Sequence, residues 1–285
     1  MLLIDFNQVV ISNFMTQVGA HTNVHLEEGL LRHMILNTIR LNVLKFREDH
    51  DEVIICCDSK KYWRRDVFPF YKAGRKKDRE KSGVDWSTMF NTLDTVRSEL
   101  IEFFPYKTML IEGAEADDII GTLVHKYHDK RDKILILSSD KDFMQLQVYN
   151  NVKQYSPILK KYIRTADAEL YLKEHIVKGD RGDGIPNVAS SDACFVNGDR
   201  QKPMRKKLIE QIANTNIETC ETISDEIRRN YARNRQLVDL SLVPEDLQNT
   251  IVSAYENYDV KDRSKLLNYF ISRKLRNLME NISEF

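Results

Sequence analysis

The sequence predicts an α/β fold whose mostly parallel central sheet is covered by helices on both faces. Short apolar runs of strand length recur through residues 1–165, and most are separated by segments with the spacing of amphipathic helices. Strands that alternate with helices form parallel sheets, and their crossover helices cover both faces. Acidic residues also close or follow several of these runs, which places them together at one edge of such a sheet.

The predicted strands are short apolar runs at residues 2–5, 52–57, 107–111, 133–138 and 151–155. Two long helices are predicted between them, at residues 26–43 and 86–104. Asp85 is the predicted N-cap of the second helix, and Pro105 ends it. We interpret the apolar stripes of both helices as core positions and not as a binding surface.

Beyond about residue 162 the strand signals fade and helical patterns dominate. Helices are predicted at residues 166–178, 203–214 and 262–281, with a turn-rich segment at 179–187. We therefore divide the chain into a core at 1–165, which contains a basic segment at 60–81, and a helical region at 166–285 that packs on it.

The apolar runs and the cysteines of the sequence indicate the compartment in which we expect the protein to act. No apolar run approaches the length of about 20 residues that spans a bilayer, and no secretory signal precedes the first predicted strand. The cysteines lack zinc or redox spacing, so we expect them to be reduced. These features indicate a cytoplasmic protein without a membrane segment. The cysteines are Cys56, Cys57, Cys194 and Cys220.

Carboxylates from four segments are expected to meet at the carboxyl edge of the sheet. Two carboxylates about 4 Å apart repel each other by roughly 4 kcal/mol at an effective dielectric constant of 20, and divalent cations would relieve that repulsion. Oxygen ligands with few histidines favour Mg²⁺ or Mn²⁺ over Zn²⁺. Any single acid is also explained as a helix N-cap or turn former, so the prediction rests on the joint pattern. The acids are Asp5, Asp58, Glu115, Asp117, Asp118, Asp140 and Asp142.

Positive charge is concentrated between residues 60 and 81, although the net charge of the chain is zero. Ten cations oppose three acids there, so the segment carries a net charge of +7. Aromatic residues are interleaved with the cations. Cations contact phosphates and aromatic rings stack on unpaired bases, which predicts nucleic-acid binding. A solvated charged surface is the alternative interpretation of such a run.

Several motifs in this chain together match one known family. The motifs are Leu3-Ile4-Asp5-Phe6, Cys57-Asp58, Tyr62-Trp63-Arg64-Arg65-Asp66, Tyr71-Lys72, Glu115-Ala116-Asp117-Asp118, Ser138-Ser139-Asp140-Lys141-Asp142-Phe143, Lys178-Gly179-Asp180 with Asp183, and the terminal Asn281-Ile282-Ser283-Glu284-Phe285. No single motif is specific, but the set covers nearly the whole chain. It resembles the structure-specific 5′ nucleases, or flap endonucleases, and most closely their phage members with ribonuclease H activity.

The resemblance implies a PIN-like, flap-nuclease core and a helix–three-turn–helix element after Gly179 that grips duplex backbone. It implies that Lys72 lies at the foot of an arch over the active site, and that Arg64 is a second catalytic cation in contact with the substrate. It also implies a cluster that holds two Mg²⁺ ions, with Mn²⁺ as a substitute. The matching metal ligands are Asp5, Asp58, Glu115, Asp117, Asp118, Asp140, Asp142, Asp180 and Asp183.

The expected function is that of a magnesium-dependent 5′ to 3′ nuclease on RNA–DNA and DNA duplexes with 5′ ends, forks or flaps. The resemblance implies removal of RNA primers during lagging-strand replication in the host cytoplasm, by a monomer with a sliding clamp and a single-strand-binding protein as partners. Nucleic-acid contacts are expected at Lys60, Arg65, Tyr71, Arg75, Lys76, Lys77, Lys202, Arg205, Lys206 and Lys207.

Two alternatives belong to other classes. A Toprim-type nuclease or primase also pairs a Glu with an Asp-x-Asp strand end, but it would not explain Asp5, Asp58 or the basic segment. A non-catalytic protein that binds DNA forks could use the same basic surface. Such a protein would not need the acidic set, which repels DNA.

Overall fold

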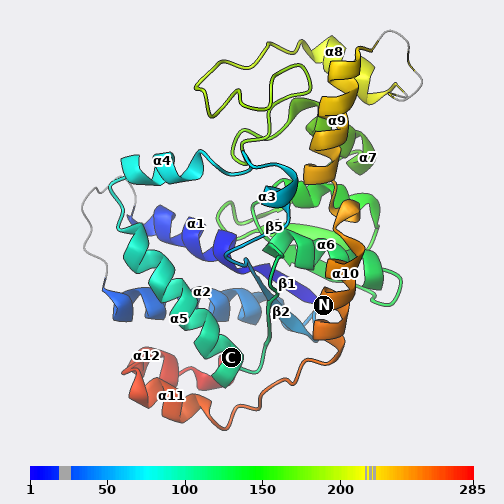
Figure 1. Cartoon of the computed structure of the whole chain (residues 1–285). Helices are drawn as coiled ribbons and strands as arrows, with labels where there is room; N and C mark the ends of the chain where they lie inside the picture. The colour runs from blue at the N-terminus through cyan, green and yellow to red at the C-terminus, as the bar shows by residue number, and fades with distance from the viewer. Residues whose placement is uncertain (19–26, 216, 218–219, 221–222) are drawn as a thin grey trace.

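The computed structural model describes residues 1–18, 27–215, 217, 220 and 223–285, which build a six-stranded sheet flanked by helices (Figure 1). In order across the sheet the strands are β3 (Lys107–Leu110), β2 (Val53–Cys57), β1 (Leu2–Asp5), β4 (Ile134–Leu137), β5 (Val152–Ser156) and β6 (Lys161–Ile163). The first five pair in parallel, and β6 runs antiparallel to β5. The predicted fold class is confirmed, and β6 is a strand that the sequence did not predict.

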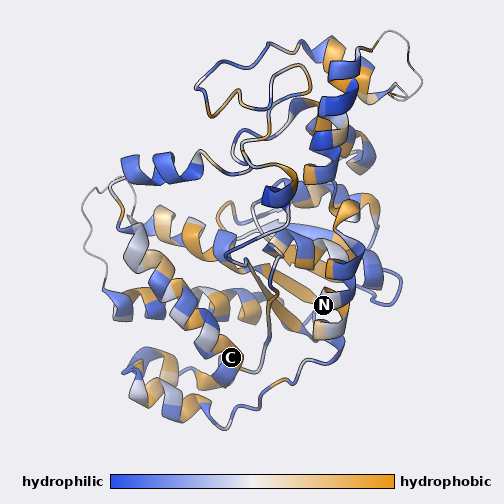
Figure 2. Cartoon of the chain, viewed as in Figure 1, coloured by the Kyte–Doolittle hydropathy of each residue, from blue (hydrophilic) through white to orange (hydrophobic). Residues whose placement is uncertain are grey.

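Each face of the sheet has its own apolar core because successive side chains of a strand point to opposite faces. In β1, Leu2 and Ile4 belong to one core and Leu3 to the other. Figure 2 shows the central strands as hydrophobic along most of their length. The first core is covered by α1 (Phe6–Val18), α2 (Glu28–Phe46) and α5 (Trp86–Phe103), and the second by α6 (Ala116–Tyr127) and α10 (Glu245–Glu256).

Both long predicted helices are present, as α2 and α5. Leu26, the first residue of the predicted helix 26–43, lies outside the described residues. The predicted N-cap of α5 is confirmed, because the Asp85 carboxylate accepts a hydrogen bond from the backbone N–H of Thr88 at 3.0 Å. The helix ends at Phe103, just before the predicted stop.

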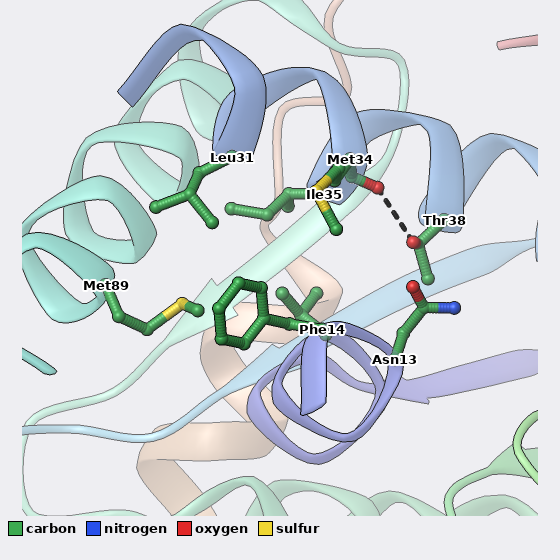
Figure 3. A pocket seen from close by; sticks show the side chains of 8 residues that line it. Asn13, Phe14, Leu31, Met34, Ile35, Thr38 and Met89 are labelled. Atoms are coloured by element: carbon green, nitrogen blue, oxygen red, sulfur yellow. Dashed lines mark hydrogen bonds between the residues drawn. The ribbon is translucent and has the colours of Figure 1, made fainter. Parts of the chain in front are cut away.

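A small cavity lies between α1, α2 and α5 (Figure 3). Its volume of about 10 Å³ is at the lower limit for one water molecule. The lining is mostly apolar, with Phe14, Leu31, Ile35 and Met89 among its residues, so we assign it to imperfect packing and not to a ligand site.

The helices after residue 166 divide between two places. α7 (Ala168–Lys178), α8 (Lys206–Ala213) and α9 (Asp225–Val238) gather beyond the carboxyl edge of the sheet, whereas α10 packs on the second core (Figure 1). The chain then reaches the first core, where Phe285 lies 5.5 Å from Phe104, ring centroid to ring centroid. The division at residue 165 stays a prediction, and the segment after it is not one packing unit.

The predicted helix at 262–281 is wrong in one respect. Two short helices, α11 (Leu266–Ser272) and α12 (Arg276–Met279), replace it. Lys274 between them has φ 56°, the left-handed conformation that ends a helix. Nothing in the apolar spacing marks this residue as a break.

The basic segment crosses the carboxyl edge of the sheet and contains two short helices, α3 (Arg64–Val67) and α4 (Arg75–Lys81). In Figure 1, α4 lies above α1 and the start of α5, and Figure 2 shows it as hydrophilic. Among the described helices, none is both long and apolar enough to span a membrane.

Candidate active site

Carboxylates from four segments line one cavity of about 770 Å³ at the carboxyl ends of the strands. Asp5 closes β1, Asp58 follows β2 and Asp140 follows β4, while two more come from the N-terminus of α6. The structure therefore brings these acids together from widely separated positions in the sequence. The acids that these four segments contribute are Asp5, Asp58, Glu115, Asp117 and Asp140, and Asp78 of the basic segment and Asp94 of α5 also line the cavity.

Burial and mutual repulsion oppose ionisation of these acids. Asp5 is 4% exposed, and burial, reinforced by the charges of Asp58 and Asp140, raises its pKa from 3.8 to about 8. Burial, together with the charges of Asp140 and Asp5, also raises the pKa of Asp117 well above its usual value. The cluster thus gains stability from any positive charge that enters it.

Hydrogen bonds fix the positions of two of these carboxylates, Asp58 and Asp140. Asp58 Oδ2 accepts from Asn7 Nδ2 at 2.7 Å, and its Oδ1 accepts from the backbone N–H of Ala116 at 2.8 Å. Asp140 Oδ1 accepts from the backbone N–H of Asp142 at 3.0 Å. The start of α6 is therefore tied to the end of β2.

Glu115 is paired with two cations, Arg64 and Lys72. Lys72 Nζ donates to its Oε1 at 2.5 Å, while its Oε2 accepts from Arg64 Nη1 and from the Tyr71 hydroxyl, each at 3.0 Å. Its side chain is only 2% exposed. Lys72 also lines the cavity, whereas Arg64 and Tyr71 do not. The catalytic role of Lys72 stays a prediction.

Arg64 and Tyr71 were expected to contact the substrate, but both side chains are buried and neither lines the cavity. The Arg64 guanidinium is buried, with Nη1 2.7 Å from Asp118 Oδ1 and Nε donating to the carbonyl of Leu237 at 2.8 Å. Tyr71 is 2% exposed, and Asp118 is fully buried. None of the three side chains lines the cavity. Each contacts Glu115 instead: Arg64 and Tyr71 donate to its carboxylate, and Asp118 accepts from its backbone N–H. The sequence could not show this, because the residues packed around Tyr71 and Arg64 come from distant segments, among them Ile176 on α7 and Leu237 on α9.

A second acidic group lies beside the first and includes a histidine that the sequence analysis missed. His175 Nδ1 lies 3.4 Å from Asp142 Oδ1, and its Nε2 lies 3.4 Å from Asp180 Oδ2. The hydrogen bond from His175 lowers the pKa of Asp180 to about 2, while burial and the nearby Asp140 raise that of Asp142 to about 8. The sequence signal was a lone histidine in the helix that leads to Asp180.

Asp183 is bound to the basic segment. Its Oδ1 accepts from Arg75 Nη2 at 2.5 Å, and its Oδ2 accepts from the Tyr71 hydroxyl at 2.9 Å. The backbone carbonyl of Asp183 also accepts from the N–H of Lys72 at 2.7 Å, and Lys72 has φ 56°. The hydrogen bond from Lys72 to the loop that carries Asp183 therefore helps to hold Lys72 in a left-handed backbone conformation, which residues other than glycine rarely adopt.

Six cations line the cavity together with the acids. Four were predicted as site residues, and Arg79 on α4 and Arg97 on α5 were not. Arg97 is held by the carboxylate of Asp94 at 2.8 Å, three residues earlier on the same helix. The cations of the lining are Lys60, Arg65, Lys72, Arg75, Arg79 and Arg97.

The remaining predicted nucleic-acid contacts are exposed but lie outside the cavity lining. Two are on α4, and four precede or begin α8, where Lys206 Nζ lies 3.5 Å from Glu210 Oε1. Their roles stay predictions. These residues are Lys76, Lys77, Lys202, Arg205, Lys206 and Lys207.

Two aromatic residues that we interpreted as core also line the cavity. Trp86 and Phe90 are one helical turn apart at the start of α5, with ring centroids 5.6 Å apart and an angle of 28° between their planes. Both are half-buried. The helical spacing was right, but the first turn of the stripe packs only in part against the first core and also lines the cavity.

The donor set fits hard divalent cations, because the carboxylates of the cavity offer only oxygen atoms. The tightest group in the described part of the chain is Asp142, His175 and Asp180, whose ligand atoms lie within 4.8 Å of one another.

A parallel sheet with buried carboxylates at its carboxyl edge, facing a cation-lined cavity, defines a metal-dependent phosphodiesterase. The comparisons name the family within this class. Residues 1–178 match the 5′-3′ exonuclease, N-terminal resolvase-like domain, and residues 166–285 match the family described as T4 RNase H, C terminal. The chain belongs to the 5′–3′ exonuclease family.

Curated relatives agree with this assignment. The chain is 37% identical to the ribonuclease H of Enterobacteria phage T4, across 99% of this chain and 95% of that protein. It is 31% identical to a 5′-3′ exonuclease of Buchnera aphidicola, across 66% of this chain and 64% of the relative. A flap endonuclease Xni of Shewanella is 29% identical across 45% of this chain and 48% of its own length.

Solved structures share the fold. T5 5′-exonuclease with bound zinc ions gives a TM-score of 0.63 at 17% identity, and the alignment covers 90% of this chain and 98% of that one. A complex of the T5 flap endonuclease with DNA and metal ions gives 0.62 at the same identity and coverage. With the family assigned, the Toprim-type alternative is excluded.

Proposed function

We propose that this protein is a magnesium-dependent nuclease that cleaves RNA or DNA strands from their 5′ ends at duplex ends, forks and flaps. One observation carries the proposal: the converging carboxylates and Lys72 share a single cavity with five arginine and lysine side chains. A phosphate backbone in this cavity would contact cations and metal ligands together.

Asp5, Asp58, Asp117 and Asp140 are the residues that would hold the ions, and Asp142, Asp180 and Asp183 are neighbouring acids that would complete the set. Mg²⁺ held by these residues would supply an activated water and would neutralise charge on the attacking and leaving oxygens. Mn²⁺ has the same preference for oxygen ligands and would substitute.

The chain's own contribution begins with Lys72. Its ammonium group, 2.5 Å from Glu115 Oε1, would donate to the scissile phosphate and stabilise the negative charge that develops there. Glu115 keeps that group in place, and Arg64 with Tyr71 keeps Glu115 in place. Arg64 therefore acts through Glu115 as a positioning residue.

Phosphates of the 5′ strand would lie along Lys60, Arg65, Arg75, Arg79 and Arg97, because these cations line the approach to the carboxylates. The exposed cations before and at the start of α8 would contact the backbone of the duplex. Such contacts position the substrate without reading its sequence.

The biological role that we propose is removal of RNA primers during lagging-strand replication in the host cytoplasm. It rests on the similarity to the T4 ribonuclease H across nearly the whole of both chains. We expect a monomer that cooperates with a sliding clamp and a single-strand-binding protein.

The test is cleavage of end-labelled forked duplexes that carry RNA or DNA 5′ arms, with Mg²⁺, with Mn²⁺ and with EDTA. We expect products from the 5′ strand in both metals and none in EDTA. Asp140→Asn should abolish cleavage and leave fork binding within about threefold of wild type. Asp129→Asn, which alters an exposed acid on the turn after α6, should change neither. Fork binding without cleavage in any metal would support the non-catalytic alternative.

A further inference from the structure

The aromatic pair Trp86 and Phe90 has a role that core packing does not account for. Other residues of the same stripe, such as Met89, Leu93 and Val96, are no more than 2% exposed and belong to the first core. Trp86 and Phe90 pack against that core only in part, and both line the large cavity. An aromatic surface left open beside a charged site is typical of a binding surface.

The orientation of this pair is fixed by the protein itself. The Trp86 indole N–H donates to Ser82 Oγ at 2.7 Å, so its polar group needs no partner from a ligand. The Phe90 ring stacks on the indole, with the centroids 5.6 Å apart. A rigid pair of rings loses little conformational entropy when a third ring stacks on it.

Cations flank the aromatic pair. The Arg79 guanidinium lies 5.3 Å from the centroid of the Phe90 ring, and Arg97, two turns along α5, lines the same cavity. Aromatic rings between basic side chains are what single-stranded nucleic acid requires, since bases stack on the rings while the phosphates lie on the cations. Double-stranded nucleic acid does not offer an unstacked base to such a pair.

We propose that Trp86 and Phe90 form a stacking platform for a base of the unpaired 5′ strand, with Arg79 and Arg97 on its flanking phosphates. The proposal deepens and rests on the proposed function, because it puts the 5′ arm in the cavity that contains the carboxylates. Stacking tolerates every base, so the platform selects unpaired strands and not sequences.

Intrinsic fluorescence tests the platform directly, because the chain contains only two tryptophans, Trp63 and Trp86. In Trp63→Phe, Trp86 is the sole emitter. Titration with oligo(dT) in EDTA, where the strand is not cleaved, should quench this emission, and an abasic oligonucleotide of equal length should not. In Trp86→Phe, the emission of Trp63 should not distinguish the two strands. Equal quenching of Trp86 by both would overturn the proposal.

Fork binding provides the second measurement. In EDTA, the wild type should bind a fork with a fully abasic 5′ arm about 5- to 150-fold more weakly than one with bases. The double variant Trp86→Leu, Phe90→Leu keeps apolar bulk against the core but removes stacking, so it should bind both forks equally. A matched control, Leu208→Ala on the exposed surface of α8, should retain the wild-type difference.

The outcomes separate the platform from the enzyme. If forks are cleaved with Mg²⁺ but abasic arms bind as tightly as normal arms, the platform is refuted and the proposed function stands. If no metal supports cleavage, the proposed function fails, while quenching of Trp86 still decides the platform. If the leucine variant unfolds, as circular dichroism would show, the fluorescence comparison decides alone.

Discussion

Asp5→Asn should stabilise the metal-free protein at alkaline pH, although it alters a residue of the active site. Asp5 is buried at the end of β1, with its oxygens bonded to the N–H of Gln8 at 3.1 Å and to Ser138 Oγ at 3.0 Å. Asparagine keeps the size of the side chain and removes its charge. The variant should therefore lack the free-energy cost of a buried negative charge, which destabilises the folded wild type.

The magnitude follows from the pKa of Asp5. A rise from 3.8 to about 8 corresponds to about 6 kcal/mol at about 1.4 kcal/mol for each tenfold change in ionisation. That value is a ceiling, since part of the shift is repulsion shared with Asp58 and Asp140. We expect a gain of at least about 1.4 kcal/mol, a tenfold change in the unfolding equilibrium.

The sign is set by which state holds the proton. The folded protein keeps the Asp5 proton up to about pH 8, whereas the unfolded chain releases it near 3.8, so ionisation of Asp5 destabilises the fold progressively between those values. The difference in stability between Asp5→Asn and wild type should be near zero at pH 4 and grow toward pH 8. Mg²⁺ should stabilise the wild type more as pH rises, since it binds the ionised form.

Urea unfolding at pH 4, 6 and 8, with EDTA and with Mg²⁺, measures these differences. Asp129→Asn is the control, because Asp129 is exposed on the turn after α6, and it should show no such trend. A stability difference for Asp5→Asn that does not change with pH in EDTA would refute the reasoning. So would Mg²⁺ stabilisation that is as large in Asp5→Asn as in wild type.

Three further outcomes are expected. Lys72→Ala should reduce kcat on forks by about 100- to 1000-fold, because it removes one electrostatic contact to the reacting phosphate, while fork affinity should fall less than tenfold. An equal loss of kcat and of affinity would make Lys72 a binding residue. Arg64→Met should destabilise the fold by about 3–5 kcal/mol in urea unfolding, because it removes the cation paired with the buried Asp118 and leaves Glu115 with Lys72 alone. An unchanged stability would contradict the buried ion pairs. Gln at both Lys206 and Lys207 should weaken binding to forks of any sequence and lower the slope of log affinity against log salt by about two, whereas an unchanged slope would remove α8 from the interface.

Several features of the site were determined by the sequence alone. A carboxylate directly after a buried strand must lie at the carboxyl edge of a parallel sheet, so Asp5, Asp58 and Asp140 were predicted to meet before any fold was known. Lys72 and the cations around it followed from charge concentration and the family resemblance. The spacing of apolar residues likewise predicted α2 and α5, because apolar residues three and four positions apart lie on the one face of a helix that packs against the core.

Only the tertiary structure decided what covers each side chain. Arg64 looked like a substrate contact, but its Nε bonds the carbonyl of Leu237, 173 positions away. Trp86 fits a core stripe by spacing and lines a cavity by position, and His175 meets Asp142 across 33 positions of sequence. Spacing along the chain fixes the face or edge that a residue occupies, since that is a property of one helix or strand. Its burial and its charge partners depend on which distant segment packs there, which no local pattern contains.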